Sequence, residues 1–253
     1  MRLVVLGCSG SGPGPDSPAS GYLVEAGETR LVLDLGNGTF GALQRVLDPW
    51  ELDGVAFSHL HPDHCADFSA LAVWRRYHPR PPAGVGALPV FAPAEADERF
   101  AAAYAPSIAQ RSTAEFAGIL EFRTHTPDAA VGEAVLRTAA VEHPCEAYAL
   151  RVEHGGRSLV YSGDTGPCTG LVELARDADV LLCEASWPHS DAMPNGVHLS
   201  GRQAGEHAAA AGVGRLLLTH VPAWTDPQAV LAEAKAVFDG PVELVRAGGE
   251  YGI

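Results

Sequence analysis

Short runs of apolar and β-branched residues, separated by Gly, Pro or Asp, recur along the whole chain. This pattern predicts β-strands. The predicted strands are 2–7, 21–26, 30–34, 53–58, 88–92, 135–141, 146–153, 157–161, 179–183, 214–218 and 242–246. Between some of these runs, apolar residues recur at helical spacing instead. The predicted helices are 66–77, 94–104, 168–177, 201–211 and 226–238.

The order of these elements predicts the fold class. The first half of the chain is rich in strands at hairpin-like spacing, and the second half repeats that style. Two packed sheets with helices outside would bury both kinds of element, so we expect an α/β fold with two mixed sheets. The Pro- and Gly-rich stretch 78–87 is typical of a surface loop rather than a domain boundary. We therefore expect a single domain spanning residues 1–253.

Composition narrows the range of partners. The 253 residues include 31 acidic and 17 basic ones, a formal net charge of −14. Because Lys and Arg supply most of the affinity for long nucleic acid, such a partner is not expected. The five cysteines stand singly without a C-x-x-C pair, which favours a reduced, cytoplasmic protein. The sequence contains no signal-peptide pattern and no run of about 18 apolar residues, so no membrane partner is expected.

One segment concentrates side chains that bind metal: Phe57-Ser58-His59-Leu60-His61-Pro62-Asp63-His64-Cys65. His59 and His61 point to the same side of an extended chain, because side-chain direction alternates there. Pro62 suits the first position of a helix, which places Asp63 and His64 in its first turn. Imidazole and carboxylate are ligands that Zn²⁺ accepts, and the clustered thiolates of a structural zinc site are missing. The segment therefore predicts metal binding.

Three more residues of the same kind follow apolar runs further along the chain. They are His143, Asp164 and His220. Folds of the α/β class often place functional groups just past the ends of strands. Taken alone, Asp164 is as easily a turn residue and His220 a loop residue. Together with the first cluster, they complete a set of five histidines and two aspartates.

The ordered set resembles the two-metal site of the metallo-β-lactamase superfamily. The motif is His59-x-His61-x-Asp63-His64, followed by His143, Asp164 and His220. The resemblance implies a four-layer αβ/βα sandwich, two divalent ions (Zn²⁺, or alternatively Mn²⁺) and a homodimer. It also implies that His59, His61 and His143 hold one ion. The second ion would be held by Asp63, His64 and His220, with Asp164 bridging the two.

Two further segments resemble paired loops of the RNase Z group in that superfamily: 180–186, which contains Glu184, and His198-Leu199-Ser200. The resemblance implies that His198 donates a proton or a hydrogen bond to the phosphate or the leaving oxygen, and that Glu184 orients it. An ordinary loop histidine is the alternative. Ser200 and Gln203 form a capping-box pattern, and a helix that begins there would offer N–H groups to a phosphate.

The glycine-rich stretch 7–15 resembles the N-terminal loop of the same group. It implies that Ser9 and Ser11 lie close to the substrate phosphate, with a simple turn as the alternative. The stretch is not a P-loop, because the Gly-Lys-Ser/Thr ending is missing.

Three features depart from the tRNA-processing members of the RNase Z group. Only 21 positions separate His143 from Asp164, which leaves no room for a protruding tRNA-binding arm. Residues 16–20 lack the basic element expected after the glycine loop, and 221–224 lack the Ser-x-Arg-Tyr expected after His220. The chain is most similar to arm-less, actinobacterial-looking members that hydrolyse cyclic nucleotides.

The resemblance thus implies a phosphodiesterase that converts 3′,5′-cyclic nucleotides to 5′-monophosphates with a hydroxide bridging the two ions. In this hypothesis Asp63 combines metal binding with orienting the nucleophile. Three alternatives stay open: a tRNA 3′-end endonuclease, a thioester or lactone hydrolase, and a binding protein that keeps the fold without metals.

Cationic and aromatic side chains are further candidates for substrate contacts. Arg75, Arg76 and Arg80 either steer an anionic nucleotide or are simply exposed beside the Pro-rich loop. Aromatic residues offer a stacking face for a base, but each is as easily part of the core or an interface. These residues are Trp74, Tyr77, Trp187 and Trp224.

Overall fold

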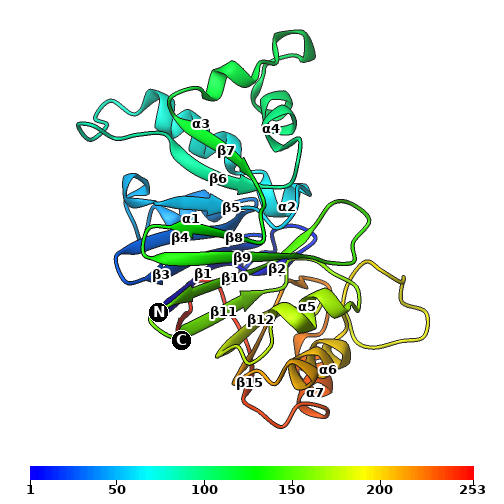
Figure 1. Ribbon diagram of the computed structural model, residues 1–253. Helices are drawn as coiled ribbons and strands as arrows, with labels where there is room; N and C mark the ends of the chain where they lie inside the picture. The colour runs from blue at the N-terminus through cyan, green and yellow to red at the C-terminus, as the bar shows by residue number, and fades with distance from the viewer.

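The computed structural model describes the backbone of residues 1–253 and all side chains except that of Ala114. Within this part of the chain, two mixed sheets of seven strands each pack against one another, and helices cover their outer faces (Figure 1). A short parallel ribbon of β2 (Ser9–Gly10) and β14 (Val221–Pro222) accompanies them. The predicted α/β fold with two packed mixed sheets and outer helices is confirmed.

The first sheet combines the N-terminal half of the chain with its last strand. In spatial order it contains β16 (Glu250–Gly252), β1 (Arg2–Gly7), β3 (Gly21–Ala26), β4 (Thr29–Leu35), β5 (Gly54–Ala56), β6 (Leu88–Ala92) and β7 (Leu120–Thr124). Strands β16, β1, β3 and β4 are antiparallel neighbours, whereas β4 to β7 are parallel. The pairing of β1 with β16 places the two chain ends side by side (Figure 1).

The second sheet is built from the C-terminal half. Its spatial order is β15 (Val242–Leu244), β13 (Leu216–Thr219), β12 (Val180–Glu184), β11 (Arg157–Tyr161), β10 (Tyr148–His154), β9 (Ala134–Ala140) and β8 (Asp128–Val131). Strands β11, β12, β13 and β15 run parallel, so the segments that leave β11, β12 and β13 emerge at one edge of the sheet. That edge carries most of the predicted downstream site residues.

Helices cover the outer face of each sheet. Those on the first sheet are α1 (Thr39–Leu43), α2 (Pro62–Cys65), α3 (Phe68–Tyr77) and α4 (Ala96–Tyr104), and those on the second are α5 (Thr169–Leu174), α6 (Gly201–Ala211) and α7 (Pro227–Lys235). Short 3₁₀ turns are η1 (Pro49–Glu51), η2 (Ile108–Gln110) and η3 (Thr113–Phe116). Among the described residues, none of these helices has the length and apolar character needed to cross a bilayer.

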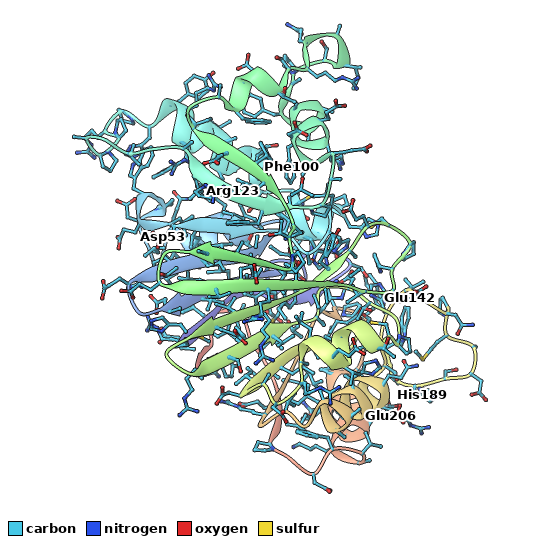
Figure 2. All side chains as sticks on the ribbon, viewed as in Figure 1. Asp53, Phe100, Arg123, Glu142, His189 and Glu206 are labelled. Carbon is cyan, nitrogen blue, oxygen red and sulfur yellow. The ribbon has the colours of Figure 1, made fainter. Side chains whose placement is uncertain are left out.

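Alternation of side chains along the strands explains the layers. In β1, Leu3 and Val5 pack between the two sheets, whereas Val4 and Leu6 pack under the helices of the first sheet. Successive residues of a strand point to opposite faces, so a strand covered on both faces is apolar throughout. The helices also turn apolar side chains toward the sheet. Phe100 of α4 points toward it and stacks on Phe68, with 3.8 Å between ring centroids (Figure 2).

The sequence pattern did not predict several short elements. Strands β7, β8 and β16 lie at or near sheet edges, and many of their side chains are exposed. Such strands lack the continuous apolar run from which the others were predicted. The helix α1 has five residues and begins after Gly38 in a left-handed conformation, too short for a helical repeat to be visible. Some predicted elements also end earlier, since the helix expected over 168–177 stops at Leu174.

Arg75 is a structural residue, and neither sequence interpretation of it is correct. Its side chain is only 6% exposed, so it is not a surface arginine. Its Nε donates to the carbonyl oxygen of Ile119 at 2.9 Å, and its Nη2 donates to that of Gly86 at 2.7 Å. The guanidinium also lies over the Trp50 ring, 4.9 Å from its centroid. Arg75 therefore ties α3 to the Pro-rich loop and does not steer a substrate.

Replacing Arg75 by methionine should lower the free energy of unfolding by about 1–3 kcal/mol, because two charge-assisted hydrogen bonds are lost. The matched control is Arg76→Met. Among the described residues, Arg76 forms an ion pair with the exposed Glu115, 3.5 Å away, and such a surface pair contributes about 0–1 kcal/mol. Urea unfolding followed by circular dichroism measures both. Equal losses for the two variants would contradict the structural role of Arg75.

Candidate metal centre

The first four site residues lie on the connection from β5 to α2. His59 is fully buried on the loop, and His61 adopts extended backbone directly before the helix. Pro62 occupies the first helical position, as predicted, since its fixed φ suits a helix start and its missing N–H is not needed there. Asp63 and His64 consequently lie in the first turn of α2.

Three imidazoles and one carboxylate form the first donor group, which we call group A: His59, His61, His143 and Asp164. His61 Nδ1 lies 3.0 Å from His59 Nε2 and 3.2 Å from His143 Nε2. Asp164 Oδ2 lies 3.7 Å from His59 Nε2. One donor atom of each residue therefore faces the same small volume.

The second donor group, group B, contains Asp63, His64, Asp164 and His220. Asp164 Oδ1 lies 3.1 Å from His64 Nε2 and 3.3 Å from His220 Nε2. Asp63 Oδ2 lies 3.2 Å from the same atom of His220 and 3.5 Å from that of His64. Asp164 belongs to both groups, one carboxylate oxygen to each.

The donor atoms fit divalent cations. Zn²⁺ binds imidazole nitrogen and carboxylate oxygen at about 2.0–2.2 Å, so tetrahedral ligands lie roughly 3.3 Å from each other, close to most of the separations seen here. In the described part of the chain, His64 Nε2 and Asp164 Oδ1 are buried and have no hydrogen-bond partner, although they face each other. Buried polar atoms rarely stay unpaired. A cation between the donors of group B would satisfy both atoms.

The protonation states of His59, His143 and Asp164 suit metal binding. Burial would lower the pKa of His64, but the carboxylates of Asp164 and Asp34 raise it, so a cation bound there would displace a proton. Burial and the neighbouring His64 lower the pKa of His59 well below its ordinary value, so its ring is neutral. Burial likewise lowers the pKa of His143. Burial alone would raise the pKa of Asp164, but the surrounding His220, His64 and His59 outweigh it and hold this carboxylate ionised. Neutral imidazole and ionised carboxylate are the forms that coordinate metal.

Asp34 supports group B and was missed from the sequence. It is fully buried in β4, and its Oδ2 accepts a hydrogen bond from His64 Nδ1 at 2.7 Å. The same oxygen accepts from the Tyr161 hydroxyl, and Oδ1 accepts from the Ser58 N–H. A carboxylate on one ring nitrogen fixes the histidine tautomer and directs the other nitrogen to the metal. The available signal was an acidic residue inside an apolar strand, 31–35.

Replacing Asp34 by asparagine should weaken metal affinity by about 10–100-fold, because His64 loses the acceptor that orients it. The matched control is Asp179→Asn. Asp179 also accepts hydrogen bonds from the N–H and the hydroxyl of one serine, Ser158, but lies outside both donor groups. Zinc titration against a fluorescent chelator measures the affinities. An unchanged affinity in the Asp34 variant would contradict this role.

His198 and Glu184 form a pair directly beside the donor groups. His198 Nδ1 lies 3.0 Å from Glu184 Oε1, and its ring centroid lies 5.3 Å from that of His220. Glu184 is fully buried at the end of β12, where it also accepts from the Thr165 N–H and from the Ser186 hydroxyl. Burial would lower the pKa of His198, but the Glu184 carboxylate raises it to about 9. His198 therefore carries a proton at neutral pH.

The long loop between β12 and α6 contains His198 and also contacts His143, which follows β9. His143 Nδ1 donates to the carbonyl oxygen of Val197 at 2.9 Å, which leaves Nε2 for group A. Figure 2 shows Glu142, next to His143, and His189 of this loop on the same side of the molecule. One loop therefore orients a residue of group A and the His198–Glu184 pair.

A family model described as the beta-lactamase superfamily domain matches residues 29–221, a range that holds all seven donor residues. The chain belongs to the metallo-β-lactamase superfamily. It is 50% identical over 258 residues to the uncharacterized protein ML1173 of Mycobacterium leprae, covering 100% of this chain and 89% of that protein. It is also 31% identical over 271 residues to a ribonuclease Z of Mycolicibacterium paratuberculosis, covering 96% and 95% of the two chains.

A solved structure shows the same fold. The metallo-β-lactamase fold protein YhfI of Bacillus subtilis, named a probable metallo-hydrolase, superposes with a TM-score of 0.86 at 27% identity. The superposition covers 99% of this chain and 98% of that one. Membership of the superfamily and the two donor groups together indicate a metal-dependent hydrolase.

The predicted substrate contacts of this superfamily member lie in three different places. Ser200 is buried and caps α6 through the predicted capping box, and its hydroxyl also bonds to His189. The Ser11 N–H faces His220 Nε2 at 3.4 Å, next to group B. Ser9 is buried and lines a separate cavity. None of the seven donor residues is among the described residues that line this cavity. Contact of these serines with substrate stays a prediction.

The aromatic candidates also differ in their surroundings. Trp74 packs on Trp50, 4.6 Å between ring centroids, as a structural residue. Trp187 packs edge-on against the His198 ring at 5.1 Å. Tyr77 and Trp224 are 68% and 77% exposed, and Arg80 is exposed. Stacking or steering by these exposed residues stays a prediction.

Proposed function

We propose that the chain is a two-metal phosphodiesterase whose substrate is a 3′,5′-cyclic nucleotide, which it hydrolyses to the 5′-monophosphate. The observation that carries this proposal is the convergence of seven donor side chains into two groups that share Asp164, with the His198–Glu184 pair beside them. Paired divalent sites are a common device for displacement at phosphorus.

In this reaction, one set of residues would bind the two ions and another would supply and position a proton. His59, His61 and His143 would hold one ion, and Asp63, His64 and His220 the other, with Asp164 contacting both. When bound, the ions supply an activated water and neutralise charge on the phosphoryl oxygens. His198 holds a proton next to both groups and is placed to deliver it to the leaving 3′ oxygen. Glu184 positions this imidazole, and Asp34 positions His64.

Two features favour a small diester over a polymeric substrate. The chain between His143 and Asp164 forms the hairpin of β10 and β11, joined at Gly155 and Gly156, so this segment lies within the sheet and carries no arm. In the part of the chain that the structure describes, no Arg or Lys side chain forms an ion pair or a hydrogen bond with any of the seven donor residues. A single phosphodiester charge needs no such cations, whereas tRNA binding draws on many.

The second candidate is a tRNA 3′-end endonuclease, favoured by the 31% identity to a ribonuclease Z along nearly the whole chain. The same donor groups would serve that reaction. The two functions therefore differ in how the rest of the substrate is held rather than in the metal chemistry.

The test incubates zinc-loaded protein with 3′,5′-cyclic AMP, 2′,3′-cyclic AMP and precursor tRNA in parallel, each with and without EDTA. We expect hydrolysis of the 3′,5′-cyclic nucleotide to 5′-AMP, detected by chromatography, and its loss with EDTA. Cleavage of the tRNA alone would establish the second candidate. Hydrolysis that EDTA leaves unchanged would contradict a metal-dependent reaction altogether.

A further inference from the structure

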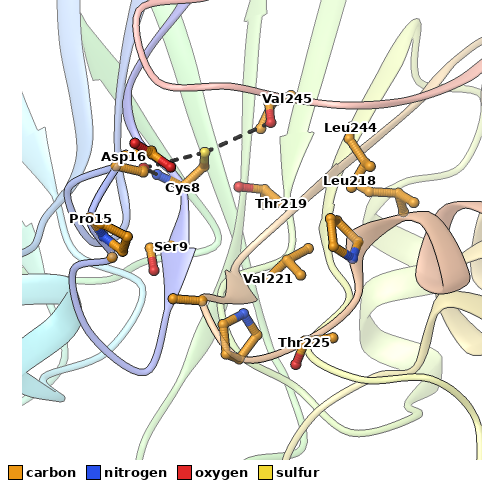
Figure 3. Close-up of a pocket in the computed structure, with 15 residues that line it drawn as sticks. Cys8, Ser9, Pro15, Asp16, Leu218, Thr219, Val221, Thr225, Leu244 and Val245 are labelled. Carbon is orange, nitrogen blue, oxygen red and sulfur yellow. Dashed lines mark hydrogen bonds between the residues drawn. The ribbon is translucent and has the colours of Figure 1, made fainter.

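A second cavity lies close to the metal centre but is separate from it. Its volume is about 340 Å³, within the range of small-ligand sites. It opens between the loop 14–17, the ribbon of β2 and β14, and the carboxyl ends of β13 and β15 (Figure 3). Ligands of α/β proteins commonly bind outside the carboxyl ends of parallel strands.

The ribbon forms a shared wall between this cavity and group B. Ser9 pairs with Val221, and Gly10 pairs with Pro222, directly after His220 in the chain. Ser9, Val221 and Pro222 line the cavity, whereas His220 contributes its ring to group B. The wall is tightly packed, because a Cβ on Gly10 would lie 2.3 Å from the His220 carbonyl oxygen.

Among the described residues that line the cavity, one hydroxyl has no hydrogen-bond partner. The Ser9 side chain is buried, with the residue 5% exposed, and its Oγ makes no hydrogen bond. The other hydroxyls of the lining are all satisfied: that of Thr219 by Tyr22, that of Ser17 by the Pro18 carbonyl, and that of Thr225 by the Ser186 carbonyl. A buried hydroxyl without a partner is costly, so a ligand that bonds to Ser9 would gain affinity.

The charge of the lining selects the kind of ligand. Asp16 is its carboxylate, and no Lys, Arg or His is among the described residues that line the cavity. The opposite wall is apolar, with Leu218, Leu244 and Val245 (Figure 3). The whole chain carries a net charge of −14. Anions such as phosphates are therefore disfavoured, and a flat apolar cation with N–H donors is favoured.

We propose that this cavity is a binding site for a ring-sized organic cation, such as an aromatic amidine, whose N–H groups bond to Ser9 and Asp16 and whose ring packs on Leu218 and Leu244. This site would bind neither the phosphate nor any other group that reacts at the metal centre. The proposal is therefore independent of the proposed phosphodiesterase.

The test compares benzamidine with benzoate, two rings of nearly the same shape and opposite charge. Isothermal titration of the zinc-loaded full chain should give a Kd of about 1 mM or below for benzamidine and no measurable binding of benzoate. Ser9→Ala should weaken benzamidine binding about 3- to 10-fold. Asp16→Asn should also weaken it, and Leu244→Trp, which fills the cavity, should abolish it.

Three results would overturn the proposal: no benzamidine binding, equal binding of the two probes, or benzamidine binding unaffected by all three substitutions. The last result would place the probe elsewhere on this acidic protein. Circular dichroism verifies the fold of each variant. If Leu244→Trp does not fold, the two polar substitutions at Ser9 and Asp16 decide the matter, because each removes a contact without adding volume.

Discussion

Replacing Asp164 by alanine should release metal from both donor groups and nearly abolish turnover. Its Oδ1 faces His64 and His220, and its Oδ2 faces His59, so one substitution removes a donor from group A and from group B together. Removing a residue that only orients a ligand already costs about 10–100-fold in metal affinity or activity. Loss of a shared ligand should therefore cost more than about 100-fold in turnover.

Elemental analysis of the purified variant measures this loss directly. We expect two zinc ions per chain in the unmodified protein and fewer than one in Asp164→Ala. The matched control is Asp53→Ala, since Asp53 accepts a backbone N–H from Arg30 and lies on the opposite side of the molecule from Glu142 (Figure 2). If Asp164→Ala retained both ions, the carboxylate would not bridge the two groups.

Replacing His198 by alanine should leave both metals bound and lower turnover by about 10²–10⁴-fold, the usual contribution of a general acid. His198 is not needed to complete group A or group B, and its Nδ1 is held by Glu184. Metal content and the steady-state rate on the cyclic nucleotide are measured on the same preparation.

The control for His198 is His154→Ala, which removes a histidine at the end of β10 that lies 3.7 Å from the exposed Glu133 in a surface contact. Its turnover should match that of the unmodified protein. Near-normal turnover of His198→Ala would remove this residue from the chemistry. Loss of zinc from that variant would instead assign it to the metal site.

The convergence of the candidate metal donors could be predicted because local sequence brings several of them close together. Four of them, from His59 to His64, stand within six positions, so strand alternation and the Pro62 helix start bring them together without tertiary information. His143, Asp164 and His220 each follow an apolar strand. The parallel register of β11, β12 and β13 then gathers two of them at one sheet edge.

Other features depend on contacts between residues that lie far apart in the sequence, so they could not be predicted from local patterns. Asp34 is an acidic residue at the end of a predicted apolar strand, and nothing nearby in the sequence shows that it is buried against Ser58 and His64 from another element. Arg75 lies on the buried face of α3 with Leu71 and Ala72, but the carbonyl oxygens of Ile119 and Gly86 that its guanidinium meets come from distant parts of the chain. The unpartnered hydroxyl of Ser9 likewise becomes visible only when β2 pairs with β14.

Anomalous diffraction at the zinc absorption edge, from crystals grown with excess zinc, tests the central claim most directly. The account predicts two strong peaks in each chain: one contacting His59, His61, His143 and Asp164, the other contacting Asp63, His64, Asp164 and His220. A map without a peak between these side chains, or with zinc bound only elsewhere, would contradict it.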